Sequence, residues 1–216
     1  MRRTQRCTPI VLSLLCACGG AVRTDTIPIA AARTQPLGSV VSVAGTATVS
    51  SGAFKSGTSD DGFAVQDPSG GIYVSESTQL NVAMSSAVSL TGTLGQSHEL
   101  LVITPPSADS VQRRGPAPLP TPRTVRTADV GPTVEGLLVR VSGTVVPPVR
   151  DDPPYGRLFH VDDGSGAIQV FVYASTSVDV SGLQVGQQVD VIGFAGRFDA
   201  IYEVWPRVQG DIHAAQ

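Results

Sequence analysis

Phe159-His-Val-Asp-Asp163-Gly-Ser-Gly166-Ala-Ile168-Gln-Val170 decides the fold, because a close copy of this stretch stands 96 residues earlier. The copy reads Phe63-Ala-Val-Gln-Asp67-Pro-Ser-Gly70-Gly-Ile72-Tyr-Val74. In both copies two short alternating apolar segments flank a turn rich in Asp, Ser and Gly, which is the pattern of a β-hairpin. The sequence therefore predicts one β-rich module that is present twice.

The likeness between the two copies extends beyond the hairpin. Upstream, Val43-Ala-Gly45-Thr46 matches Val141-Ser-Gly143-Thr144, and downstream Val88-Ser-Leu-Thr-Gly92 matches Val189-Asp-Val-Ile-Gly193. A glycine inside a long alternating segment suits a first strand that bends to close a small barrel. Each module is thus expected to hold five strands: a long bent strand, the hairpin, and two closing strands.

This strand pattern resembles the OB-fold, a five-stranded Greek-key barrel. More narrowly, the shared motif is similar to OB-type modules of secreted bacterial proteins, which often stand beside extracellular nuclease domains. We expect an all-β protein with two five-stranded OB-fold-like Greek-key barrels in tandem, and an SH3-like small barrel is the alternative. The expected parts are a signal peptide (1–17), a tether (18–36), barrel 1 (37–105), a Pro-rich linker (106–133) and barrel 2 (134–213).

The N-terminus carries basic residues, then a short apolar stretch, then Leu15-Cys16-Ala17-Cys18. This arrangement resembles the lipobox of bacterial lipoproteins, which implies cleavage after Ala17 and acyl chains on Cys18. An ordinary signal peptide cut near Ala21 and an uncleaved apolar stub are the alternatives. Gly19 stands where an Asp would resemble an inner-membrane retention signal. We therefore expect a lipid-anchored protein of the bacterial cell envelope, at the outer rather than the inner membrane.

Charge and cysteine content exclude several classes of site. The formal net charge is −3, and removal of Arg2, Arg3 and Arg6 with the signal peptide leaves 12 basic against 18 acidic residues. This balance disfavours a strong, salt-sensitive grip on nucleic acid. Because all three cysteines lie within the first 18 residues, the mature body is expected to have no internal disulfide and no cysteine metal site.

A candidate ligand-binding face follows from strand alternation in the hairpin of the second module. Phe159, Val161, Ile168, Val170 and Val172 share the inward parity, so the opposite side chains point outward. Aromatic rings beside an amide and a histidine would suit stacking of bases or sugar rings. The outward set is His160, Gln169, Phe171 and Tyr173, with Arg157 and Arg197 near bordering loops and Tyr73 as its weaker counterpart in the first module.

Each of these residues also has a purely structural interpretation. Phe171 and Tyr173 could instead pack against the loop 174–184 or against the other module, and His160 could be a solvent-facing cross-strand residue. Trp205 is expected to plug a barrel or an interface rather than contact a ligand.

Metal and catalytic sites are not expected. Asp67, Asp162 and Asp163 precede Ser-Gly turns, where an Asp carboxylate bonds nearby backbone N–H groups. His98, His160 and His213 lack paired ligand spacing, and no nucleophile–base pair stands out. We therefore predict no metal, no cofactor and no enzymatic activity.

The sequence thus favours a non-catalytic envelope lipoprotein whose tandem OB modules contact single-stranded nucleic acid or an oligosaccharide. The alternative is a scaffold lipoprotein that binds another envelope protein. Under both hypotheses the membrane is a partner through Cys18.

Overall fold

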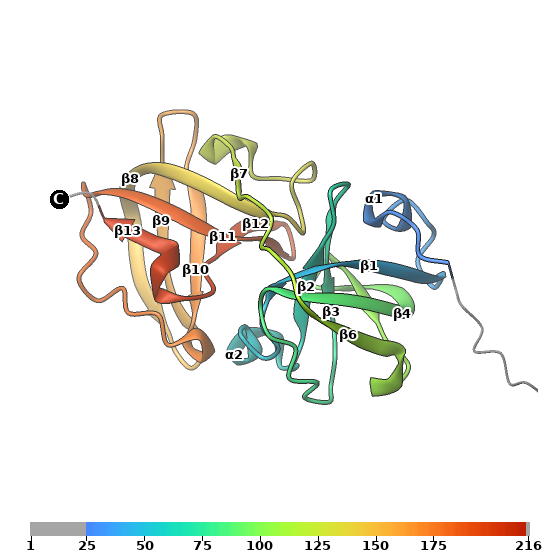
Figure 1. Cartoon of the computed structure of the whole chain (residues 1–216). Helices are drawn as coiled ribbons and strands as arrows, with labels where there is room; N and C mark the ends of the chain where they lie inside the picture. The colour runs from blue at the N-terminus through green and yellow to red at the C-terminus, as the bar shows by residue number, and fades with distance from the viewer. Residues whose placement is uncertain (1–24, 215–216) are drawn as a thin grey trace, which may run out of the picture.

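The computed structural model describes residues 25–214, so the predicted signal peptide and Cys18 lie outside the described residues. Two β-barrels follow one another along the chain (Figure 1). None of the helices within residues 25–214 has the length and hydropathy needed to cross a membrane.

Barrel 1 is a closed five-stranded barrel. Its strands are hydrogen-bonded in the order β1-β2-β3-β5-β4, and β4 pairs back with β1. Every pairing is antiparallel except β3–β5. The strands are β1 (Val40–Val49), β2 (Phe63–Gln66), β3 (Gly71–Val74), β4 (Ser86–Ser97) and β5 (Leu100–Thr104).

Barrel 2 repeats this topology. The order is β8-β9-β10-β12-β11, β11 pairs back with β8, and only β10–β12 is parallel within the barrel. The prediction of two tandem OB-fold-like barrels is confirmed, because both have the OB strand order. The strands are β8 (Leu138–Asp152), β9 (Gly156–Asp162), β10 (Ile168–Tyr173), β11 (Gln188–Phe198) and β12 (Ile201–Trp205).

The two barrel cores contain the residues that strand alternation assigned to them. Phe159, Val161, Ile168, Val170 and Val172 are buried together in barrel 2. Their counterparts Phe63, Val65, Ile72 and Val74 are buried in barrel 1.

The predicted tether is wrong for its C-terminal part. The Ile27 N–H donates to the Ser42 carbonyl at 2.8 Å. Helix α1 (Ile29–Ala32) buries Ile29 and Ala32 in the core of barrel 1. The physical reason is that these apolar side chains remove more surface from water on the barrel than in an extended tether.

Much of the predicted linker is also attached to the barrels. Strand β6 (Val111–Pro116) pairs with β4, and β7 (Arg123–Thr124) pairs with β8. Only residues 117–122 between them carry no strand or helix. The remaining elements are α2 (Lys55–Thr58), η1 (Ala108–Ser110), η2 (Thr127–Asp129), η3 (Ala174–Thr176), η4 (Gln209–Asp211) and β13 (Ile212–Ala214), which pairs with β11.

The hairpin aspartates act as turn residues, as expected, and they also hold the segment that precedes each barrel. Asp67 accepts from the N–H groups of Ser69 and Ile29, at 2.7 and 2.9 Å. Asp163 accepts from the N–H groups of Ser165 and Thr127, at 2.9 and 3.2 Å. Hydrogen bonds from Ser165 and Thr127 hold the pKa of the Asp163 carboxyl well below its usual range. The duplication therefore includes this contact as well as the barrel.

Candidate ligand pocket between the barrels

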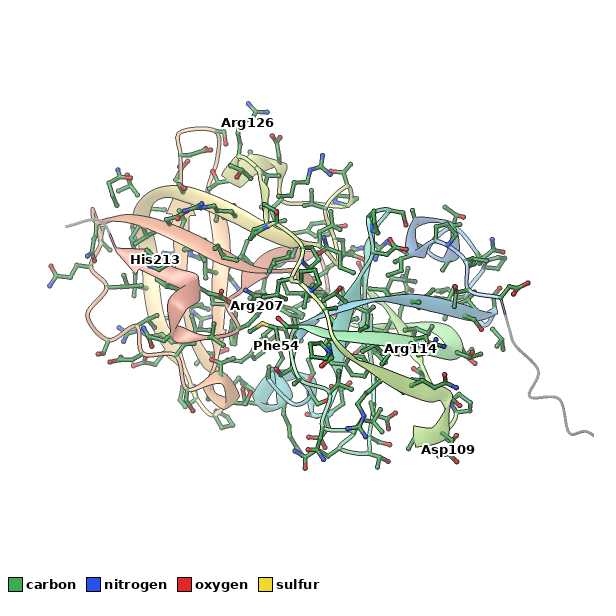
Figure 2. The ribbon with its side chains drawn as sticks, in the orientation of Figure 1. Phe54, Asp109, Arg114, Arg126, Arg207 and His213 are labelled. Atoms are coloured by element: carbon green, nitrogen blue, oxygen red, sulfur yellow. The ribbon has the colours of Figure 1, made fainter. Side chains whose placement is uncertain are left out.

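The outer faces of the two barrels pack against each other. The contact is one buried apolar cluster, named here the interface cluster, to which both barrels contribute. Figure 2 places Phe54 at the junction of the two barrels. The cluster contains Val49, Phe54, Ala64, Tyr73, Leu100 and Val102 of barrel 1 with Leu158, Phe171, Tyr173, Phe194 and Trp205 of barrel 2.

Trp205 is the centre of the aromatic packing in this cluster. Its ring centroid lies 5.3 Å from that of Phe54 and 5.2 Å from that of Tyr173, both in edge-on geometry, and 5.4 Å from that of Phe194. Such pairs stabilise a contact by about 0.5–1.5 kcal/mol beyond area burial. With 2% of its surface exposed, Trp205 plugs the interface, as the sequence predicted.

An open stacking platform is not present at the predicted aromatic rings. Phe171, Tyr173 and Tyr73 are only 8%, 5% and 2% exposed. Of the two structural interpretations, packing against the other module is the one observed. The reason is the size of the apolar outer face of barrel 2, to which Leu158, Phe194 and Trp205 also belong. An apolar patch of this extent is rarely left exposed to water, and here barrel 1 covers it.

Polar contacts fix the relative position of the barrels around the cluster. Arg33 forms an ion pair with Glu135 at 2.9 Å, and the Leu138 N–H donates to Gln66 Oε1 at 2.8 Å. Arg207 Nη1 donates to the Thr48 carbonyl at 2.8 Å while the same guanidinium pairs with Asp211. Arg207 is therefore buried and unavailable to a phosphate.

At one point the two backbones touch. A Cβ on Gly71 would stand 1.9 Å from the Gly136 carbonyl oxygen, and Gly136 has a φ of +86°. Only glycine allows this approach at that conformation.

Beside the interface cluster, the barrels leave a cavity of about 570 Å³ open between them. This volume lies in the range of small-molecule sites. Barrel 1 contributes the α2 loop and the β4–β5 turn, and barrel 2 contributes the outer face of β9, β10 and β12. The lining residues are Gly57, Ser59, His98, Arg150, Asp152, Tyr155, Leu158, Gln169, Phe171, Tyr173, Phe198, Ile201 and Glu203.

Glu203 is the buried polar group of this pocket, at 4% exposure. Its Oε2 accepts from Trp205 Nε1 at 2.6 Å, and its Oε1 accepts from the Gln169 amide. Burial raises the pKa of Glu203 to about 6, although these two hydrogen bonds act in the opposite direction. The carboxylate is held in place at both oxygens, by Trp205 from its own strand β12 and by Gln169 from the neighbouring strand β10.

The two basic residues of the pocket already have acidic partners. His98 Nδ1 lies 3.2 Å from Asp199 Oδ1, and its ring stacks on Phe198 at 4.3 Å. The Arg150 guanidinium lies 3.9 Å from Asp152 Oδ1.

Three of the seven predicted face residues, Gln169, Phe171 and Tyr173, come together in the pocket lining. The other four lie elsewhere. His160 contacts the Pro148 carbonyl, and the Tyr73 hydroxyl donates to Asp60. Arg157 lines a separate hollow of about 480 Å³ beside Asp151. Arg197 forms an ion pair with Glu99 across the interface.

Sequence reasoning missed Glu203, Phe198 and His98 as pocket residues. His98 lies in the β4–β5 turn and Phe198 at the end of β11, and these two places meet only when the barrels dock. No cluster of three or more His, Cys, Asp or Glu side chains within residues 25–214 could hold a metal ion.

No protein-family model matches the chain, and no curated protein matches it. Among solved structures, a chain of the complex of OBody AM1L10 with hen egg-white lysozyme shares 19% identity at a TM-score of 0.37, over 46% of this chain and 99% of that one. A murine DNA-binding protein bound with double-stranded DNA shares 9% identity at a TM-score of 0.39, over 81% of this chain and 96% of that one. The tetrameric p202 HIN2 shares 13% identity at a TM-score of 0.38, over 84% of this chain and 96% of that one. The fold is established here by strand order rather than by these likenesses.

Proposed function

We propose that this protein is a non-catalytic binding protein of the bacterial cell envelope that holds an oligosaccharide in the pocket between its two barrels. The observation that carries the proposal is the pocket itself: about 570 Å³, walled by aromatic rings and supplied with a fixed amide and carboxylate. Both barrels contribute to it, so the tandem arrangement is required for the site.

The pocket lining suits sugar rings. Tyr155 and Phe198 line the pocket with 49% and 43% of their surface exposed, so the C–H surface of a sugar can pack against their rings, above the buried edges of Phe171 and Tyr173. Gln169 and Glu203 stand on adjacent strands and offer acceptors for hydroxyl groups. A few fixed polar groups in an apolar wall are what gives a small-molecule site its orientation and specificity.

The charge of the lining disfavours nucleic acid as the ligand. Asp152 and Glu203 are acidic, while Arg150 and His98 each face a carboxylate partner. A phosphate backbone needs unpaired cations along its path. The excess of acidic over basic residues in the whole chain also disfavours nucleic acid as the ligand.

A calorimetric screen of the full chain against neutral oligosaccharides, single-stranded DNA and RNA tests the proposal. We expect one oligosaccharide class to bind with one site per chain and with an affinity that changes little between low and high salt. Binding of nucleic acid that weakens steeply with salt would contradict it. No binding to any of these would also contradict it and would favour a protein partner.

The site is then located with two matched variants. Ile201 lies at the pocket and is 50% exposed, whereas Val185 is 59% exposed and does not line it. We expect Ile201→Ser to weaken oligosaccharide binding by about tenfold, through lost apolar contact and changed shape, and Val185→Ser to leave it unchanged. Equal effects of the two substitutions would place the ligand elsewhere.

For the anchor, we propose acylation at Cys18. Eight residues separate Cys18 from Ile27, whose N–H is bonded to barrel 1. A chain of that length spans at most about 30 Å, so the barrels would be held close to the membrane surface.

Labelling cells with an alkyne-tagged fatty acid tests the anchor. We expect the wild type and Cys7→Ala to take up the label and Cys18→Ala to lose it. Label retained in Cys18→Ala, or absent from the wild type, would overturn the assignment.

A further inference from the structure

One buried charge in the pocket has no cationic partner. Both oxygens of the Glu203 carboxylate accept hydrogen bonds, but from neutral donors, the indole of Trp205 and the amide of Gln169. Within residues 25–214 no Lys, Arg or His forms an ion pair with it. A carboxylate removed from water is costly to keep charged unless a cation compensates it.

The other carboxylate of the pocket, that of Asp152, does have a cation beside it. Asp152 has Arg150 beside it at 3.9 Å, and both side chains are more than one third exposed. His98 is likewise engaged with Asp199 and Phe198. The charged pairs at the rim are therefore locally balanced, and the unbalanced charge is at Glu203.

The surroundings of Glu203 are suited to a cation. Phe171 and Tyr173 line the same cavity with their ring centroids 4.8 Å apart, and Phe198 lines it from the C-terminal end of β11. Aromatic faces attract an ammonium group electrostatically, most strongly where water is excluded. A carboxylate with two of its four lone-pair positions unused still accepts from an ammonium donor.

We infer that the pocket selects amino sugars, with a protonated amine of the sugar ring held against Glu203. This rests on the proposed function, which it narrows from oligosaccharides in general to those with a free amine. A charge-assisted hydrogen bond in a pocket of low dielectric is stronger than the neutral bond that an acetamido or hydroxyl group makes at the same position.

Two ligands that differ only at the amine test the inference: the glucosamine trimer and the N-acetylglucosamine trimer, titrated into the full chain at near-neutral pH. We expect the wild type to bind the amine form about tenfold more tightly, because a hydrogen bond to a charged group contributes more than the neutral bond of the acetamido group. Glu203→Gln keeps the shape and can still accept from Trp205. It should remove the preference, measured as the ratio of the affinities of the same variant for the two trimers.

Asp152→Asn is the matched control, since it removes the same charge from the same pocket. We expect the preference to persist in this variant. A preference lost in Asp152→Asn but kept in Glu203→Gln would overturn the assignment to Glu203. Equal affinity of the wild type for the two trimers would refute the inference and leave the proposed function standing, whereas a pocket that binds no oligosaccharide would refute both.

Discussion

Trp205, on the last barrel strand of barrel 2, packs edge-on against Phe54 from a loop of barrel 1, with ring centroids 5.3 Å apart and planes inclined by 74°. Both side chains are almost fully buried. Neither barrel alone would cover them, so this pair links the stability of the two barrels.

Phe54→Ala tests that link. Phe54 has no exposed surface, and removal of a buried phenyl ring ordinarily costs about 3–5 kcal/mol. We expect a loss of this size in the free energy of unfolding, measured with urea. Phe198→Ala is the control, because that ring is 43% exposed and its removal should cost about 1 kcal/mol or less. Equal losses for the two variants would mean that Phe54 is not buried against barrel 2.

Gly136→Ala should loosen the interface without unfolding either barrel. The new Cβ would stand 2.3 Å from the Gly71 carbonyl oxygen, at a backbone conformation that alanine rarely adopts. We expect unchanged strand content by far-UV circular dichroism, together with greater access of acrylamide to Trp205. Gly131→Ala is matched, since nothing lies within 4 Å of its Cβ, and it should behave as the wild type. Unchanged quenching in Gly136→Ala would argue against the backbone contact.

The Arg207–Asp211 ion pair is buried, and breaking it should lower the free energy of unfolding substantially. Asp211→Asn keeps the side-chain shape but leaves the guanidinium without a counter-charge, which typically costs about 3–5 kcal/mol. A clear drop in Tm is the expected result in thermal unfolding. Asp190→Asn, in the more exposed pair with Arg140, should shift Tm little. If both variants melt alike, Arg207 is solvated rather than buried.

Glu203 should make stability depend on pH in a defined window. Folding raises its pKa from 4.5 to about 6, mainly through burial. The fold therefore favours the protonated form, so this contribution is fully present below pH 4.5 and is lost as pH rises through about 6. The difference corresponds to about 2 kcal/mol.

Unfolding of the wild type and of Glu203→Gln, compared across this window, isolates the contribution of Glu203. The wild type should lose about 2 kcal/mol relative to the variant as pH rises. Parallel pH profiles of the two proteins would show that Glu203 is not buried as a carboxyl group.

The repeated hairpin was sufficient to predict two OB-type barrels, because alternation in Phe159–Val170 identifies the core side of each strand. The same alternation placed Gln169, Phe171 and Tyr173 on one outer face, and they do share it. Alternation says which side a residue faces but not what covers that side. Strand alternation could therefore not predict that barrel 1 docks onto this face.

Other residues had weak or ambiguous signals. Phe54 is a lone aromatic in the polar segment 50–62, where no periodicity marks it as buried. Glu203 stands between Ile201 and Trp205 at strand spacing, which does place it on an apolar outer face. Its role follows only once Gln169 is known to lie on the neighbouring strand.

The central claim is that the outer faces of the two barrels meet and enclose a pocket, and Trp205 reports on it directly because it is the only tryptophan of the chain. The measurement is acrylamide quenching of tryptophan fluorescence in the full native chain. The interface predicts the blue-shifted emission of a buried indole and weak quenching, with both lost together on unfolding. Red-shifted emission and strong quenching in the native protein would contradict it, because the barrels would then be apart and no pocket would lie between them.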